Sequence, residues 1–192
     1  TRFEPEQEQL YEAFAELVAR RHADTLFSRD TGTVDEQVAG LLRERAWTVA
    51  VAESCTGGEL AARLTAPAGA SEYFKGGVVA YSNELKVAQV GVERELIEAH
   101  GAVSEQVARA LAAGVRRALA AEVGVGVTGI AGPGGGTEEK PVGLVWFGIA
   151  GPEGVSLTRS LTLPGARADV RDRATTVALH LVRRLLLGEH DA

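Results

Sequence analysis

The sequence predicts an α/β fold, a three-layer α/β/α sandwich around a mixed, mostly parallel sheet. Strand-like segments at 47–53, 76–81 and 123–128 alternate with segments of helical periodicity, which is the pattern of a parallel sheet covered by helices. A hairpin pattern at 142–163 comes late in the chain and adds antiparallel strands. The chain has 192 residues, 45% of them hydrophobic, and is long enough to bury one substantial core.

The first 32 residues precede this predicted sandwich. An amphipathic helix is expected to begin near Pro5, from the spacing of Leu10, Phe14, Leu17 and Val18. Residues 23–32 are then expected to form a strand or a linker. The first residues resemble an internal segment of a longer protein. We therefore expect residues 1–32 to be the tail of an upstream linking domain and residues 33–192 to form the α/β domain.

The domain is expected to open with a helix, a strand and a second helix. Thr33 and Glu36 have the spacing of a capping box ahead of a helix that ends near Arg45. A buried strand then reaches Glu53. The next helix, over 59–64, is closed by the Pro-Ala-Gly breaker that follows it.

The middle of the chain repeats this alternation. The run Gly-Gly-Val-Val-Ala-Tyr at 76–81 predicts a second buried strand. Asn83 is the expected N-cap of the helix after it, which places Lys86 at about the third helical position. A short helix then ends at Gly101, and Ser104 is expected to cap the one that follows.

The last third supplies the rest of the sheet. The strand at 123–128 runs into a glycine-rich stretch at 129–137, which is either a flexible excursion or a backbone cradle. Strands at 142–150 and 155–163 are expected to pair around the turn at 151–154. A final helix is indicated by the spacing of Val170, Ala174, Val177, Ala178, Leu181, Val182 and Leu185.

The composition argues against several classes of function. A formal net charge of −6 disfavours a protein built mainly to bind nucleic acid. No segment reaches the ~18 apolar residues of a membrane helix and nothing resembles a signal peptide, so a cytoplasmic protein is expected. One cysteine excludes an intramolecular disulfide, and four scattered histidines form no metal-ligand pattern. We therefore expect no metal and no cofactor.

The turn at 54–58, Ser-Cys-Thr-Gly-Gly, is the best place for a nucleophile. Ser54 follows a rigid strand, and glycines let backbone N–H groups approach a ligand. Those N–H groups and the helix dipole favour an oxyanion beside Ser54. The alternative is that Ser54 and Thr56 only cap the helix. Cys55 is a rival nucleophile, but no histidine is near it in sequence, which favours a packing role.

Lys86 is the candidate base for Ser54. In the first turn of a helix the dipole disfavours its charged form, and a neutral lysine could take the hydroxyl proton. The alternative is a solvated surface lysine. Tyr81 could relay a proton or orient Lys86, or it could pack in the core. Glu53 could pair with a lysine, hold a substrate hydroxyl or compensate the helix dipole.

Two further features could hold a phosphate. The glycine-rich loop at 132–136 offers successive N–H groups, although it lacks the Lys and Ser/Thr of a P-loop, and residues 138–141 beside it read as a solvated tip or a lid. Arg167 and Arg171 lie one helical turn apart and could bind a phosphate or form an exposed basic face. The expected substrate-binding residues are Glu53, Thr56, Gly57, Gly58, Gly132, Gly134, Gly135, Arg167 and Arg171.

Five ordered motifs resemble the CinA carboxy-terminal domain family, and the resemblance covers about residues 34–188. The motifs are A-E-S-C-T-G-G at 52–58, Y-S-N-x-x-K at 81–86, G-A-V-S at 101–104, T-G-I-A-G-P-x-G-G at 128–136 and E-E-K-P-V-G at 138–143. Members of this family include the bacterial nicotinamide-nucleotide amidase, or NMN deamidase. In full-length members an upstream domain with nucleotide pyrophosphatase activity and a small linking domain precede this one, and residues 1–32 resemble the tail of that linking region.

The resemblance implies hydrolysis of the carboxamide of nicotinamide mononucleotide to nicotinate mononucleotide and ammonia, in pyridine nucleotide recycling. Ser54 would be the nucleophile, Lys86 its base, Tyr81 an aid to proton transfer and Thr128 a contact to the reacting group or the substrate. The alternative is a non-catalytic nucleotide-sensing or protein-interaction module linked to competence and DNA damage. A third reading is a serine amidase for another amide. We also expect a homo-oligomer.

Overall fold

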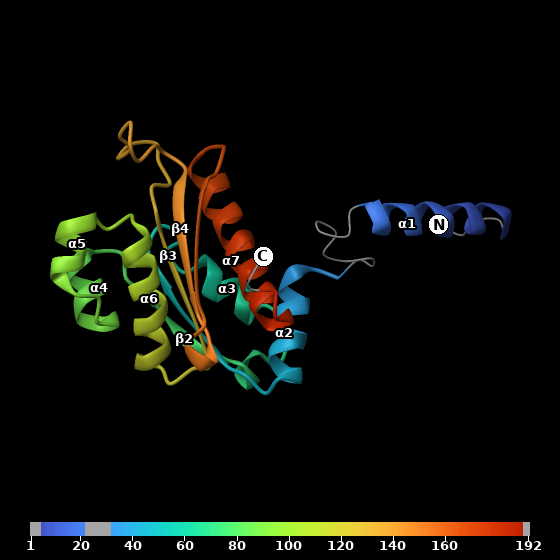
Figure 1. Cartoon of the computed structure of the whole chain (residues 1–192), viewed down its shortest axis with the longest axis horizontal. Coiled ribbons are helices and arrows are strands. Elements are labelled where there is room, and N and C mark those ends of the chain that lie inside the picture. Colours follow the sequence, from blue (N-terminus) through green and yellow to red (C-terminus); the bar gives the residue numbers. More distant parts are fainter. Residues whose placement is uncertain (1–4, 22–31, 190–192) are drawn as a thin grey trace. The chain divides into compact units, whose positions relative to one another are not determined.

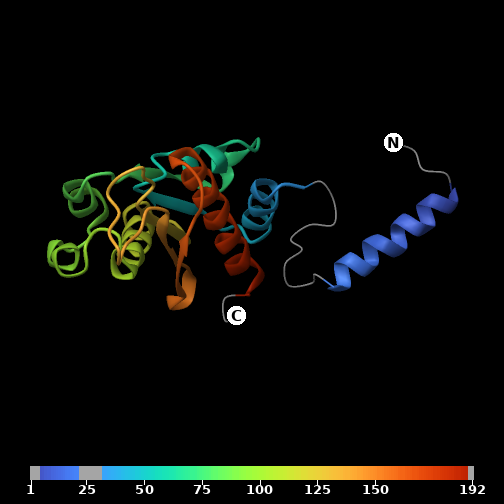
Figure 2. The same ribbon diagram turned by 90° about the horizontal axis from the view of Figure 1, so that it is seen from above.

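The computed structural model describes residues 5–21 and 32–189 (Figures 1 and 2). The chain divides into two compact units, Thr1–Val34 and Asp35–Ala192. The first unit contains the predicted helix α1, Pro5–Arg21, on which Leu10 and Phe14 are exposed. Apart from Gly32, the predicted strand or linker lies outside the described residues, and the assignment of this unit to a linking domain stays a prediction.

The second unit is organised around a five-stranded sheet of order β2-β1-β3-β4-β5. β1 pairs in parallel with both β2 and β3, whereas β4 is antiparallel to β3 and to β5. The predicted hairpin is therefore present, and the mixed sheet is confirmed. The strands are β1 Val49–Glu53, β2 Phe74–Val79, β3 Val123–Gly129, β4 Leu144–Ala150 and β5 Ser156–Thr162.

Helices cover both faces of this sheet, which confirms the three-layer sandwich (Figures 1 and 2). One face carries α2 Val34–Glu44, α3 Glu59–Thr65 and α7 Arg167–Leu187. The other carries α4 Asn83–Val90, α5 Arg94–His100 and α6 Glu105–Ala118. Two short 3₁₀ turns are η1 Ala70–Glu72 and η2 Pro152–Gly154. β1 is buried along its whole length and β3 up to its last residue, because helices cover both of their faces.

The start of α4 differs from the prediction in a way that matters for Lys86. Its N-cap is Ser82, with an extended backbone and a hydroxyl that accepts from the N–H of Leu85 at 3.2 Å, whereas Asn83 is already helical. Lys86 is therefore the fourth residue of the helix. β2 ends at Val79, so Tyr81 lies two residues beyond the strand.

Glycines let α6 pack directly on the backbone of the sheet. A Cβ built on Gly126 of β3 would lie 2.5 Å from the carbonyl oxygen of Ala108, and one built on Gly148 of β4 would lie 2.2 Å from the same atom. These contacts involve backbone rather than flexible side chains, so the helix itself would have to move. The alternating glycines of Val-Gly-Val-Gly-Val in β3 thus serve the packing of α6.

Replacing Gly148 by alanine is expected to lower the free energy of unfolding by about 1–3 kcal/mol, because the added methyl group overpacks the interface with α6. Urea unfolding followed by circular dichroism measures the change. The matched control is Gly40→Ala in α2, where an added Cβ meets no atom within 4 Å. That variant should be more stable than the wild type by about 0.5–1 kcal/mol, from helix propensity. Equal stability of Gly148→Ala and wild type would contradict the packing described here.

Candidate active site

Three of the predicted catalytic residues come together at one edge of the sheet. Ser54 directly follows β1, Thr128 lies near the end of β3, and Tyr81 follows β2. Since these three strands are parallel, their carboxyl ends share an edge. The N–H of Ser54 donates to the carbonyl oxygen of Val127 at 2.9 Å, which fixes the serine against β3.

Lys86 and Ser54 form a buried pair. The Nζ of Lys86 lies 3.2 Å from the Oγ of Ser54, and the two residues are 1% and 9% exposed. The same Nζ donates to the carbonyl oxygens of Ala80 at 2.9 Å and Tyr81 at 3.2 Å. These two carbonyls lie beyond the end of β2 and orient the amine. The alternative of a solvated surface lysine at position 86 is therefore wrong.

The three hydrogen-bond partners of this amine allow it to exchange a proton with Ser54. A neutral amine has two N–H groups and one lone pair, whereas an ammonium has three N–H groups. The carbonyls of Ala80 and Tyr81 use two N–H groups in either state. The remaining position faces the Oγ of Ser54, where it is a lone pair in the neutral state and a donor in the charged one. A proton can thus pass between the two atoms while both carbonyl contacts are kept.

Burial favours the neutral form of this lysine. It lowers the pKa of Lys86 by desolvation, and the charge of Glu84 works in the opposite direction. Burial also raises the pKa of the Cys55 thiol to about 12, so this group stays protonated near neutral pH. A protonated thiol is a poor nucleophile, whereas the Oγ of Ser54 faces the amine of Lys86, so Ser54 is the reactive candidate of the turn.

Glu53 caps helix α3 from within the core. Its carboxylate accepts from the N–H groups of Gly58 at 3.0 Å, Leu60 at 3.1 Å and Ala61 at 2.8 Å. The side chain is 1% exposed, so of the roles considered for Glu53 the structure supports compensation of the helix dipole. The free N-terminal donors of α3 that the sequence suggested are therefore occupied by this carboxylate.

The donors left for an oxyanion are consequently fewer than expected. The N–H of Gly57 donates to the carbonyl oxygen of Ser54 at 3.1 Å, and that of Gly58 to Glu53. Within the described chain, the N–H groups of Cys55 and Thr56 are the two in this turn that donate to no oxygen atom; both face the Cys55 sulfur, where they partly offset the effect of burial on the pKa of the thiol. Gly57 and Gly58 instead supply left-handed backbone, with φ of 61° and 99°.

Tyr81 contributes two different groups to the site. Its carbonyl oxygen orients Lys86, as described above, whereas its side chain is 56% exposed and its hydroxyl accepts from Nη2 of Arg167 at 2.9 Å. The alternative of core packing for this ring is wrong. Nη1 of Arg167 donates to the carbonyl oxygen of Gly132 at 2.9 Å, so one arginine joins Tyr81 to the glycine-rich loop.

Thr128 and Arg171 are engaged with the backbone around the site. The hydroxyl of Thr128, which is 1% exposed, donates to the carbonyl oxygen of Ala102 at 2.8 Å. Nη2 of Arg171 donates to the carbonyl oxygen of Thr56 at 2.9 Å and pairs with Glu59 at 2.8 Å. The Oγ1 of Thr56 and the Nε of Arg171 are buried without a hydrogen-bond partner in the described part of the chain. These contacts make Arg171 a support of the turn at 54–58.

The family model of the CinA C-terminal domain matches residues 31–186 of the chain. The chain belongs to this family. The "CinA-like protein" of Mycolicibacterium gilvum is 55% identical over 188 residues, which are 98% of this chain and 44% of that protein. The protein of the same description from Mycolicibacterium paratuberculosis is 56% identical over 190 residues, which are 97% of this chain and 43% of that protein. The chain thus spans less than half the length of these curated relatives.

Solved structures of CinA-type proteins share the fold. The competence damage-inducible protein A from Klebsiella pneumoniae is 34% identical with a TM-score of 0.77, over 80% of this chain and 95% of that one. The competence/damage inducible protein CihA from Agrobacterium tumefaciens is 36% identical with a TM-score of 0.76, over 84% and 98%. The predicted membership of the CinA family is therefore confirmed.

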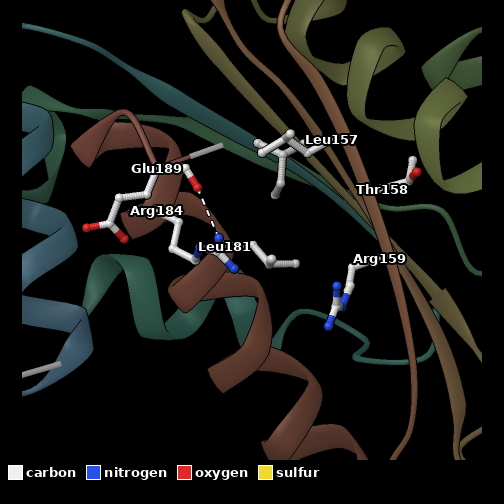
Figure 3. A pocket seen from close by; sticks show the side chains of 7 residues that line it. Leu157, Thr158, Arg159, Leu181, Arg184 and Glu189 are labelled. Carbon is white, nitrogen blue, oxygen red and sulfur yellow. Dashed lines mark hydrogen bonds between the residues drawn. The ribbon is translucent and has the colours of Figure 1, made fainter. Parts of the chain in front are cut away.

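A pocket of about 90 Å³ lies elsewhere on this CinA-type domain (Figure 3). Since Arg167 and Arg171 belong to the first turns of α7 and this pocket adjoins its last two turns, it is separate from the Ser54 site. Nη2 of Arg184 donates there to the carbonyl oxygen of Glu189 at 3.1 Å. The lining residues are Ile149, Leu157, Thr158, Arg159, Leu181, Arg184 and Glu189.

Among the described residues of this chain, no helix is long and apolar enough to span a membrane. Over 5–21 and 32–189, no three His, Cys, Asp or Glu side chains gather in a way that could hold a metal ion.

Sequence reasoning missed two groups that shape the site. The carbonyl oxygen of Ala80 has no sequence signal, since any residue offers the same atom. The sequence indicates a solvated tip or a lid for the segment that contains Lys140, but the Nζ of Lys140 donates to the carbonyl oxygens of His100 at 2.7 Å and Val103 at 2.8 Å. The loop that contains Lys140 is thus fastened to the turn between α5 and α6.

Proposed function

We propose that this chain is a nicotinamide-nucleotide amidase that hydrolyses the carboxamide of nicotinamide mononucleotide to nicotinate mononucleotide and ammonia. The observation that carries the proposal is the buried amine of Lys86, 3.2 Å from the hydroxyl of Ser54 and oriented by two backbone carbonyls. A serine beside a lysine of lowered pKa is a known arrangement for amide hydrolysis. Membership of the CinA family is consistent with an enzyme of this kind.

The first half of the proposed reaction acylates the enzyme. Neutral Lys86 takes the proton of Ser54 while the Oγ attacks the carboxamide carbon. The N–H groups of Cys55 and Thr56 hold the negative oxygen of the tetrahedral intermediate. The ammonium of Lys86 then gives its proton to the amide nitrogen, the carbon–nitrogen bond breaks, and ammonia leaves an ester on Ser54.

The second half repeats these roles with water. Lys86 takes a proton from water as the oxygen attacks the ester carbon, and the same N–H groups hold the oxyanion. Return of the proton to the Oγ of Ser54 breaks the ester bond and releases nicotinate mononucleotide. The neutral amine is restored, so the cycle closes without a net change in the enzyme.

The nucleotide phosphate is proposed to bind at the glycine-rich loop. Gly132 and Gly135 have φ of 81° and 86°, so the backbone there turns in ways that other residues rarely adopt. Arg167 lies beside this loop through its bond to Gly132. Arg171 is already paired with Glu59 and Thr56, so we assign the phosphate to the loop and Arg167.

The experiment that tests the proposal is incubation of the purified chain with nicotinamide mononucleotide, with ammonia and nicotinate mononucleotide measured together. Both products should form in equal amounts at a rate proportional to the enzyme concentration. If the folded chain releases neither product, the amidase proposal for this chain is wrong and the non-catalytic nucleotide-sensing or protein-interaction module becomes the better description. Ammonia released only from other amides would point to a serine amidase of different specificity.

A further inference from the structure

The glycine-rich loop between β3 and β4 is fastened to both layers of helices. On one side, Arg167 of α7 donates to the carbonyl oxygen of Gly132, near the start of the loop. On the other, Lys140 near the end of the loop donates to the carbonyl oxygens of His100 and Val103, in the turn from α5 to α6. The loop therefore projects past the strand ends (Figure 1), and side-chain hydrogen bonds hold it on both sides.

The segment 100–103, which is the last residue of α5 and the turn after it, has each of its carbonyl groups bound by a side chain. Lys140, near the end of the loop, supplies one donor, and Thr128 of β3, just before the loop begins, supplies another. Three of the sequence motifs, at 101–104, 128–136 and 138–143, therefore meet in one cluster of hydrogen bonds. In chain order the carbonyls belong to His100, Gly101, Ala102 and Val103, and their donors are Lys140 Nζ, Ser104 Oγ, Thr128 Oγ1 and again Lys140 Nζ.

The contacts of Lys140 are of a kind that fixes a loop. An ammonium that donates to two carbonyl oxygens makes charge-assisted bonds, which are stronger than those between neutral groups. The backbone of Lys140 also closes a turn with Thr137, through bonds of 2.8 Å and 3.0 Å. A Cβ on Gly101 would lie only 3.1 Å from the Nζ, so the glycine there leaves room for the amine.

This fastening compensates for the composition of the loop. The run Gly-Pro-Gly-Gly-Gly at 132–136 loses much conformational entropy when it is ordered. Within the described residues, the N–H groups of Gly134, Gly135 and Gly136 have no acceptor, so they are available to an anion. Because the charge of Lys140 is already directed at two carbonyls, it acts on such an anion only through the position of the loop.

We propose that Lys140 is the positioning residue that holds the glycine-rich loop in the shape that binds the phosphate of the nucleotide substrate. This inference rests on the amidase proposed above. It assigns to the E-E-K-P-V-G motif a task in substrate recognition, at a residue that does not touch the substrate. The reacting carboxamide is bound at Ser54, so loss of Lys140 should affect binding of the phosphate and leave the chemical step largely intact.

The kinetic test compares Lys140→Met with wild type on two substrates, nicotinamide mononucleotide and nicotinamide riboside, which lacks the phosphate. We expect KM for the mononucleotide to rise about tenfold with kcat nearly unchanged, and kcat/KM for the riboside to stay as in wild type. Lys140→Arg, which keeps the charge, should recover much of the loss. Lys75→Met, at an exposed lysine of β2, is the matched control and should behave as wild type. An equal loss on both substrates would overturn the role in phosphate binding.

Hydrogen–deuterium exchange tests the same residue without turnover. The N–H groups of Thr137, Lys140 and Gly143 are hydrogen-bonded in the loop, and their exchange should be about tenfold faster in Lys140→Met than in wild type or Lys75→Met. Unchanged exchange over residues 130–143 would show that Lys140 does not hold the loop, and the proposal would be wrong. If wild type turns over neither substrate, the amidase and the phosphate role fail together, whereas the exchange result still decides whether Lys140 holds the loop.

Discussion

Replacement of Ser54 by alanine is expected to lower kcat for nicotinamide mononucleotide by about 10⁴-fold or more, because no other group can form the acyl-enzyme ester. The loss should fall on kcat, with KM little changed, since the hydroxyl contributes bond formation rather than binding. Ammonia release under saturating substrate measures it. The fold should be retained, because Ser54 is small and its backbone bond to Val127 does not involve the side chain.

Two further variants make this result specific. Ser71→Ala removes an exposed hydroxyl in η1 and should leave turnover unchanged. Cys55→Ala removes the rival nucleophile, and it should keep most of the wild-type rate because the buried thiol has a pKa of about 12 and stays protonated. If Cys55→Ala were inactive and Ser54→Ala active, the assignment of the nucleophile would be reversed.

Replacement of Lys86 by methionine is expected to lower kcat by about 10³-fold or more, since it removes the general base and the proton donor for ammonia together. Methionine fills a similar volume in the buried site, so the variant should keep the fold. Circular dichroism checks that it does. The control is again Lys75→Met, the same chemical change at an exposed position. A Lys86→Met variant with wild-type kcat would exclude the lysine as the base.

The dependence of the wild-type rate on pH tests Lys86 as the general base, because the rate should follow the pKa of its amine. The active form in this mechanism is the neutral amine, so kcat/KM should rise with pH and reach its plateau below the 10.5 of an ordinary lysine, because burial lowers the pKa of Lys86. The charge of Glu84 raises that pKa. Glu84→Gln removes this charge and should therefore move the rise to lower pH. A shift to higher pH would contradict the assignment of the titrating group.

Much of the architecture could be predicted because its signals are local. The alternation of strand and helix patterns, the glycine-marked turn after Glu53 and the Ser104 cap each depend on residues within a few positions of one another. The start of α4 was predicted one residue late, because both Ser82 and Asn83 are good N-caps and only the backbone conformation distinguishes them. The strand predicted at 76–81 is β2 at Phe74–Val79, so both of its predicted ends lie two residues too late.

The roles of the charged side chains were harder to predict. A substrate contact is one of the roles predicted for Glu53 and Arg171, beside compensation of the helix dipole for Glu53 and an exposed basic face for Arg171. In the structure Glu53 accepts from the N-terminal N–H groups of α3, and Arg171 pairs with Glu59. A buried charge needs partners, and here the backbone and neighbouring side chains provide them. Which partner a long side chain reaches depends on how the helices pack, and the sequence carries no direct record of that.

From the sequence by itself, the α/β class, the CinA family and the candidates Ser54 and Lys86 followed, because spacing, turn chemistry and ordered motifs are written along the chain. The tertiary structure alone decided that Lys86 points inward to Ser54, that the carbonyls of Ala80 and Tyr81 orient it, and that Lys140 ties the loop to a turn nearly forty residues earlier. The physical reason is that these contacts join groups distant in sequence. Their separation is set by the packing of helices on the sheet, and that packing depends on many residues at once.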